Sequence, residues 1–438
     1  MSAISLSTSV NRHYLSKLMK LTEVMDVAAS EDIYDARGMK LVAKGARLTL
    51  AQQDTLGSHK LKKTLESSLS AEGGADTGLI VATASRVLDA SVPLRRILGT
   101  SAGSGNGNGA GASPLAILGN MRFDPAMRMM LTLTDRDMPQ ALEHSVTVAL
   151  LSIGMARKLK LSQDEQMVAG LAGLLHDIGE LYIDPAYLAP GKRLLPHEWA
   201  HLVVHPRIGQ MLINELASYP VAVARAVAEH HERLDGTGYP RQLPGTQISA
   251  TGQAVSVAEM LAGLLHKDYP LERAELALKI IPGEHSHDLL SAISGAMHAE
   301  PAGHSAQAHV APDDVVGKLH SQICAALETG RALAASPHTA PRPRELVERT
   351  VDRIRTIQRA FISTGLDFYL NHNHGLAGDD GALLFEKAVA TREITWRLRD
   401  IARDLALHTA ASPPDTLLFA GLIQTLDGAV PAPAASAA

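Results

Sequence analysis

The chain has 438 residues, which at ~150 residues per domain is enough for roughly three domains. Lysine and arginine number 41 against 46 aspartate and glutamate, a formal net charge of −5 that argues against nucleic acid or an anionic membrane surface as the main partner. The single cysteine excludes an intramolecular disulfide, and no stretch approaches the ~18 apolar residues of a membrane helix. We therefore expect a cytoplasmic protein.

The composition and the N-terminal pattern predict a mainly α protein that begins with a small α+β module in residues 1–80. Hydrophobic residues make up 46% of the chain but aromatic residues only 3%, a mixture that favours helices packed on helices. Short β-prone runs flank a turn at residues 35–38, and a helix is expected over residues 50–61.

A helix and a linker should follow in residues 81–120. The helical pattern covers residues 79–98. Residues 101–113 are mostly Gly, Ser, Ala and Asn, with too little apolar surface to offset the entropy of ordering. We interpret this segment as flexible.

The best-ordered domain is predicted at residues 121–275, where apolar residues recur every three or four positions. Residues 276–345 read as a variable region of helix and loop. Residues 346–411 predict two long amphipathic helices, which suggest a hairpin or a homodimer contact. The C-terminal segment 412–438 ends in an Ala/Pro-rich tail that we expect to be disordered.

Ionisable side chains interrupt the apolar pattern of the central domain at a few places. Burying them is costly unless they are paired or bind a metal. Adjacent residues on a helix point about 100° apart, so an imidazole and the neighbouring carboxylate can reach two different ions. The candidate metal ligands are His144, His176, Asp177, His205, His230 and His231. Nitrogen and oxygen donors without cysteine suit iron, manganese, zinc or nickel.

The histidine pair is followed by a glycine-rich turn in the segment EHHERLDGTGYP, residues 229–240. Gly236 and Gly238 permit positive φ angles. The chain can therefore reverse close to the metals and present backbone N–H groups there.

Three motifs together resemble one known family: HDIG at 176–179, HP at 205–206 and HHERLDGTGYP at 230–240. They look like the HD-GYP group of the HD metal-dependent phosphohydrolases, over about residues 121–275. The N-terminal EDIYDARGMKLVAKG also resembles a small module that often precedes such domains. The resemblance implies an all-helical bundle core and hydrolysis of the bacterial messenger cyclic di-GMP to pGpG or GMP.

Matched position by position, the resemblance also implies which residues form the metal and substrate site. The six residues above correspond to metal ligands, and Glu259 stands where the family has a final Asp ligand. Gln140 replaces a Glu of three-metal members, so two divalent ions are expected, with iron or manganese favoured. Catalytic roles fall on Asp177 and His176. The residues expected to bind substrate are Gly236, Gly238, Tyr239, Arg233 and Lys267.

Several positions depart from the family pattern where it has cations near the phosphates: Glu180, Ala189 and the HKDYP segment with Asp268. Glu180 either lies near the phosphates or points to solvent, and the cations that can substitute are Lys192, Arg193, Arg233 and Lys267. Two alternatives to a cyclic di-GMP phosphodiesterase follow. One is a weak or inactive signalling module that binds the nucleotide or partner proteins; the other is a phosphohydrolase of another nucleotide.

Overall fold

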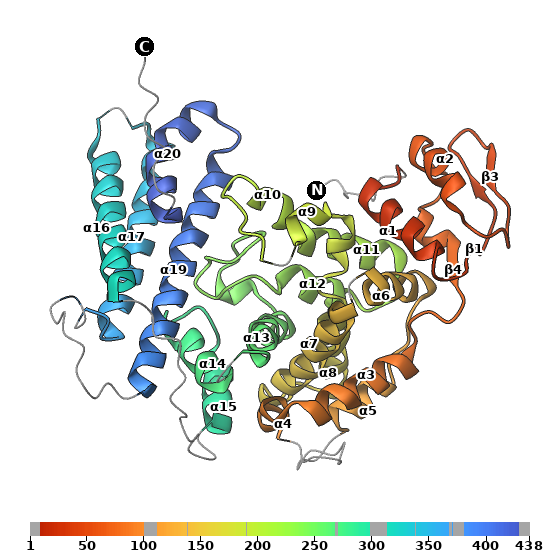
Figure 1. Ribbon diagram of the computed structural model, residues 1–438, viewed down its shortest axis with the longest axis horizontal. Helices are drawn as coiled ribbons and strands as arrows, with labels where there is room; N and C mark the ends of the chain where they lie inside the picture. The colour runs from red at the N-terminus through yellow and green to blue at the C-terminus, as the bar shows by residue number, and fades with distance from the viewer. Residues whose placement is uncertain are drawn as a thin grey trace. The chain divides into compact units, whose positions relative to one another are not determined.

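The computed structural model describes residues 9–99, 112–137, 139–189, 191–267, 270–297, 313–337, 339–367, 370 and 381–428 (Figure 1). Within these ranges the protein is mainly α, as predicted, with two small antiparallel sheets. Most of the predicted linker, Asp268 and the predicted tail lie outside the described residues. No described helix combines the length and apolar character needed to cross a bilayer.

The chain forms two compact units. The first comprises Met1–Lys192, His201–Ala274 and Gly283–Ala299, and the second comprises Arg193–Ala200, Glu275–Pro282 and Glu300–Ala438. Every candidate metal ligand lies in the first unit.

The N-terminal module contains the expected turn. Strand β2 (Ile33–Tyr34) pairs antiparallel with β3 (Lys40–Val42), and the Gly38 N–H donates to the carbonyl of Asp35 at 3.0 Å. Gly38 has a φ of +88°, which glycine adopts without steric cost. A second pair, β1 (Val27–Ala29) with β4 (Leu69–Ala71), closes the module beside helix α1 (Arg12–Thr22).

Two predicted helices have different bounds in the structure. The helix expected at 50–61 is a 3₁₀ turn, η1 (Leu50–Gln52), followed by α2 (Gln53–Ser58), because Lys60 and Leu61 form β-bridges instead. The helix expected at 79–98 is split into α3 (Thr77–Ala90) and α4 (Val92–Leu98). Pro93 has no N–H for a continuous helix, and Ser91 caps the new one by accepting from the Leu94 N–H.

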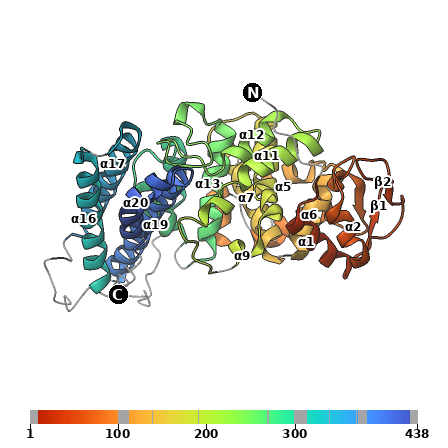
Figure 2. The same ribbon diagram turned by 90° about the horizontal axis from the view of Figure 1, so that it is seen from above.

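The helical core of the first unit is built around α7, α8, α12 and α13, which pack on one another (Figures 1 and 2). The apolar residues that predicted a buried face of α7 are all buried, among them Val146, Ala149 and Ile153. The elements of this region are α5 (Pro114–Gly119), α6 (Pro125–Asp137), α7 (Pro139–Lys158), α8 (Gln163–Leu175), η3 (Ile178–Tyr182), α9 (Pro185–Leu188), α10 (Trp199–Leu202), α11 (His205–Leu216), α12 (Val221–Glu229), η4 (Gly245–Gln247), α13 (Ala250–Leu265), α14 (Pro270–Lys279) and α15 (His287–Met297).

The second unit is a set of packed helices: α16 (Asp313–Ala335), α17 (Pro341–Ser363), α19 (Gly381–Thr409) and α20 (Pro413–Asp427). Helix α16 lies in the region expected to contain helix and loop, whereas α20 was not expected. Helix α20 starts at Ser412, whose side chain caps it, and its two prolines fit the first turn, where they do not break a helix.

The apolar stripes of α17 and α19 that suggested a homodimer are buried inside the chain, with Ile354, Phe361, Ile394 and Leu398 in one common core. These residues already have partners in their own chain. A homodimer through the C-terminal helices therefore stays a prediction and would need other surfaces.

Candidate metal centre

The His-Asp pair lies at the end of α8, where the helix gives way to the 3₁₀ turn η3. Helix α8 is fixed at its start by Ser162 and Glu165, which cap each other's backbone, and His176 is its C-cap residue. The His176 side chain is completely buried, whereas Asp177 is 27% exposed. An apolar helix thus delivers a buried imidazole and a partly accessible carboxylate to one place.

Three buried histidines share one hydrogen-bonding pattern. The Nδ1 atoms of His176, His205 and His230 lie 2.8, 2.8 and 2.6 Å from the backbone carbonyl three residues earlier. A carbonyl oxygen only accepts, so each Nδ1 carries the proton and donates. In the neutral form of each ring Nε2 then keeps its lone pair, and this is the form in which histidine binds a metal.

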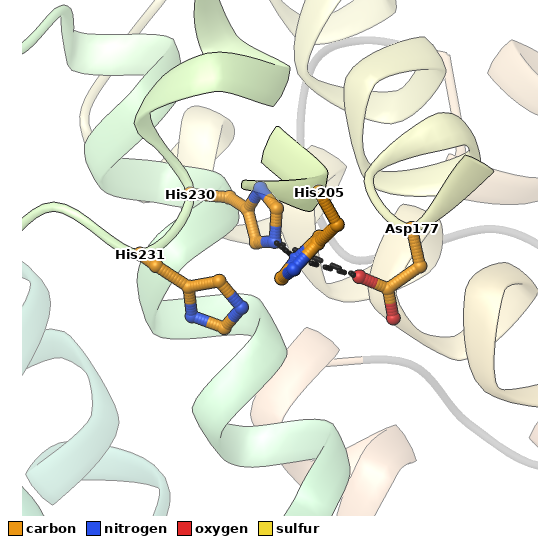
Figure 3. A group of neighbouring side chains, drawn as sticks. All are labelled: Asp177, His205, His230 and His231. Carbon is orange, nitrogen blue, oxygen red and sulfur yellow. Dashed lines mark hydrogen bonds and ion pairs between the residues drawn. The ribbon is translucent and has the colours of Figure 1, made fainter. Parts of the chain in front are cut away.

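The predicted ligands assemble into two neighbouring groups. One group contains Asp177, His205, His230 and His231 (Figure 3), and the other contains His144, His176 and Glu259; within each group the donor atoms lie within 4.8 Å of one another.

The carboxylate of Asp177 faces both groups. Its Oδ1 is 3.3 Å from the Nε2 of His205, and its Oδ2 is 2.9 Å from the Nε2 of His176. This is the arrangement of a bridging ligand, with one oxygen available on each side.

The contacts between donors show that the groups fit cations. The Nε2 atoms of His205 and His230 lie 3.2 Å apart, although both carry lone pairs. The buried Nε2 of His176 has no hydrogen bond of good geometry, although oxygens of Asp177 and Glu259 lie at 2.9 and 3.1 Å. Lone pairs that converge in this way require a proton or a cation between them. The donor set fits two divalent transition-metal ions.

The electrostatics lead to the same conclusion. Burial opposes ionisation of Asp177 and Glu259, but the adjacent His176 outweighs it and holds the pKa of both carboxyls well below their usual range. Burial, reinforced by the charge of His230, lowers the pKa of His231 far below its usual value. At neutral pH these three groups are therefore in the forms that bind metals, ionised carboxylate and neutral imidazole.

A glycine lets His205 approach Asp177. A Cβ on Gly179 would overlap the carbonyl oxygen of His205 and lie 2.9 Å from the carbonyl carbon and 3.0 Å from the Gly209 nitrogen. The turn η3 can therefore pack directly on the start of α11, which places His205 beside Asp177.

A buried carboxylate orients the histidine pair, and sequence reasoning missed it. Glu229 is fully buried and accepts from the Ser249 N–H and hydroxyl at 2.9 and 2.5 Å and from Arg225 at 2.7 Å. These bonds tie the end of α12, which carries His230, to the start of α13, which carries Glu259. The signal in the sequence was a glutamate at the end of an otherwise apolar helix.

The glycine-rich turn has a structural role that differs from the expected one. Gly236 has a φ of +77°, but its N–H donates to the Arg233 carbonyl at 2.9 Å, within the turn. A Cβ on Gly238 would overlap the backbone of residues 231–233. The turn thus folds tightly onto the histidine pair, and the ring of Tyr239 stacks on His231 with centroids 4.5 Å apart.

The four cations proposed to replace the missing phosphate-binding residues have different surroundings. Arg233 lies 4.0 Å from the buried Glu284, and Lys192 lies over the ring of Tyr187. Arg193 belongs to the second unit, where it pairs with Asp427 at 2.7 Å. Lys267 is exposed just beyond the end of α13.

Glu180 does not point to bulk solvent, so that alternative is wrong. It is partly buried and lines a cavity of about 40 Å³ together with Asp177 and His144. Burial and the charge of Asp177 raise the pKa of Glu180 to about 7. Lys17, which sequence reasoning did not single out, lines the same cavity.

Comparison with known proteins places this site in a family. Residues 128–288 match the family described as the HD domain. The chain is 40% identical over 118 residues to a Pseudomonas aeruginosa protein named a cyclic di-GMP phosphodiesterase, covering 27% of this chain and 28% of that one. A Vibrio cholerae protein named 3'3'-cGAMP-specific phosphodiesterase 3 is 33% identical over 132 residues, or 30% of this chain and 28% of that one.

A Xanthomonas campestris response regulator named a cyclic di-GMP phosphodiesterase is 38% identical over 113 residues, or 25% of this chain and 30% of that one. The chain therefore spans less than a third of the length of these relatives. The matched region, with its HDIG and HHERLDGTGYP motifs and its paired ligand groups, is an HD domain of the HD-GYP family.

Proposed function

We propose that this protein is a metal-dependent phosphodiesterase that hydrolyses cyclic di-GMP to pGpG or GMP. The observation that carries the proposal is the carboxylate of Asp177, which offers one oxygen to each of two groups of buried donors. The relatives named as cyclic di-GMP phosphodiesterases support the substrate class.

In this proposal the two groups hold two divalent ions, with iron or manganese favoured. His144, His176 and Glu259 hold one ion, and His205, His230 and His231 hold the other. When bound, such ions supply an activated water and offset negative charge on a phosphoryl group. Asp177 belongs to both sets, so it holds the two sites next to each other.

The protein supplies orientation. The carbonyls that accept from each Nδ1 hold the imidazole rings in place, and Glu229 fixes the distance between α12 and α13. Asp177, Glu259 and His144 are 22 to 30% exposed, so a substrate phosphate can reach this side of the site. Tyr239, stacked on His231, is the predicted substrate-binding residue that lies beside a ligand group.

A second candidate substrate is 3'3'-cGAMP, because one of the matched relatives is named for that specificity. Gly236, Gly238, Arg233 and Lys267 stay predicted as substrate-binding residues for either nucleotide. A module that binds the nucleotide without hydrolysing it is a third outcome, motivated by the negative charge of Glu180 in the cavity.

The test is a product assay on full-length protein purified anaerobically and supplied with iron or manganese. Cyclic di-GMP, 3'3'-cGAMP and linear pGpG are incubated separately, and the products are separated by chromatography. We expect cyclic di-GMP to yield pGpG or GMP, and Asp177→Ala to abolish the reaction. The matched control is Asp164→Ala, which removes an exposed carboxylate in the first turn of α8 and should leave activity unchanged.

Hydrolysis of 3'3'-cGAMP alone would transfer the proposal to the second substrate. Binding of cyclic di-GMP without turnover in the metal-loaded protein would refute the enzymatic proposal and favour the binding module. Equal activity of Asp177→Ala and the wild type would show that the reaction occurs at another site.

A further inference from the structure

The N-terminal module contacts the segment that follows the His-Asp pair. Helix α1 packs on η3, and the rings of Tyr14 and Tyr182 stack with centroids 5.2 Å apart. The side-chain amide of Asn11 donates to the carbonyl of Tyr182 at 3.2 Å, and the Tyr182 hydroxyl donates to the buried Glu66 of the same module. These contacts hold α1 in one position relative to η3.

The next residue on this face of α1 is Lys17, one turn after Tyr14. Lys17 is only 4% exposed, and its ammonium donates to the carbonyl of Glu180 at 3.4 Å. Placing a cation there costs free energy unless anionic groups lie nearby. The contact joins residues 163 positions apart in the sequence.

The cavity beside Lys17 is also bounded by the metal-ligand groups. Its lining includes Asp177, which belongs to one group, and His144, which belongs to the other. Its volume of about 40 Å³ corresponds to about three water-sized groups. Phosphoryl oxygens fit such a space, whereas a base or a ribose would have to lie outside it.

The charges favour an anion in this cavity once the ligand groups hold cations. The negative charge of Asp177 is then offset by the ions, and Lys17 places a positive charge on the wall. A lysine ammonium is a compact charge with three donors and is a common phosphate ligand in proteins. Lys17 is the cation on the wall that can attract a phosphoryl oxygen.

We propose that Lys17 of the N-terminal module binds a phosphoryl oxygen of the substrate in this cavity, so that the module forms part of the active site. The inference rests on the proposed function for the identity of the substrate. Binding of a phosphate group does not require turnover, so it is tested separately from that function.

The test is a calorimetric titration of inorganic phosphate into the full-length, manganese-loaded protein. Lys17→Met removes the charge from a side chain of similar length, and Lys17→Arg keeps the charge while also changing the packing. Lys20→Met removes an exposed lysine from the same helix and is the matched control. We expect phosphate affinity to fall at least tenfold in Lys17→Met, to fall less in Lys17→Arg and to be unchanged in Lys20→Met.

A second readout is steady-state hydrolysis of cyclic di-GMP, or of a generic phosphodiester if the nucleotide is not turned over. Lys17→Met should raise KM more than it lowers kcat, with metal content unchanged. Phosphate affinity within twofold of the wild type in Lys17→Met would overturn the inference. So would equal losses of affinity in Lys17→Met and Lys17→Arg, because both variants disturb packing and only one removes the charge.

Discussion

Gly179→Ala should disrupt the contact between η3 and α11 that places His205 beside Asp177. The added Cβ would lie 2.9 Å from the carbonyl carbon of His205 and would overlap its oxygen, whereas ordinary contacts begin near 3.4 Å. Both neighbours are backbone atoms, so no side-chain rotation relieves the overlap, and the segments must separate by about 0.5 to 1 Å.

We expect the substitution to destabilise the protein by about 1 to 3 kcal/mol, the usual cost of overpacking a core. For a unit of this size that corresponds to a fall in Tm of about 2 to 5 °C. The separation also moves His205 away from Asp177, whose atoms are now 3.3 Å apart. The protein should therefore lose the ion held by His205, His230 and His231 in preference to the other.

The assay combines thermal denaturation with elemental analysis after anaerobic purification. The control is Gly263→Ala in α13, where a new Cβ would meet nothing within 4 Å. That exposed helical position should gain slightly in stability, because alanine favours helix over glycine. A Gly179→Ala protein with the Tm and metal content of the wild type would refute the reasoning.

Three further predictions follow. Asp177→Ala should lower the metal content of both groups, whereas His231→Ala should lower mainly that of its own group. Equal metal stoichiometries for these two variants by elemental analysis would contradict the bridging role of Asp177. At pH 8, above its pKa of about 7, Glu180 is mostly ionised, so Glu180→Gln should remove about 1 kcal/mol of repulsion in the cavity and tighten inorganic phosphate binding roughly fivefold. An unchanged calorimetric Kd at that pH would count against it. Burial raises the pKa of Glu66 above its ordinary value of 4.5, so the fold loses stability as rising pH ionises this buried carboxyl. Glu66→Gln removes that ionisation and should therefore raise Tm more at pH 8 than at pH 4.5. A larger gain at pH 4.5 in thermal scans would refute the prediction.

The ligand groups were predictable because their signals are local. His176 and Asp177 interrupt an apolar helix, and His230 and His231 stand directly before a glycine-rich turn. Such residue types are expensive to bury without a partner, and the structure brings them together.

Other features depend on packing between distant segments and left no local signal. Lys17 reaches the cavity only because α1 packs on η3, and nothing in its own sequence neighbourhood distinguishes it from Lys20. The exposed position expected as one alternative for Glu180 did not anticipate the turn η3, where Glu180 lines the same cavity as Asp177 and His144.

The helix that was missed has a different explanation. Helix α20 begins with two prolines, a residue that breaks a helix interior, in a segment for which no helix was expected. Only its N-cap at Ser412 and its packing against α16 and α19 show that the prolines lie in the first turn. The break between α3 and α4 depends similarly on where Pro93 lies relative to a cap.

The most direct test of the two-ion centre is the metal stoichiometry of the full-length wild-type protein after anaerobic purification, measured by elemental analysis against protein concentration. The two ligand groups joined by Asp177 predict two transition-metal ions per chain. A stoichiometry of zero, or of one ion that excess metal does not raise, would contradict the account.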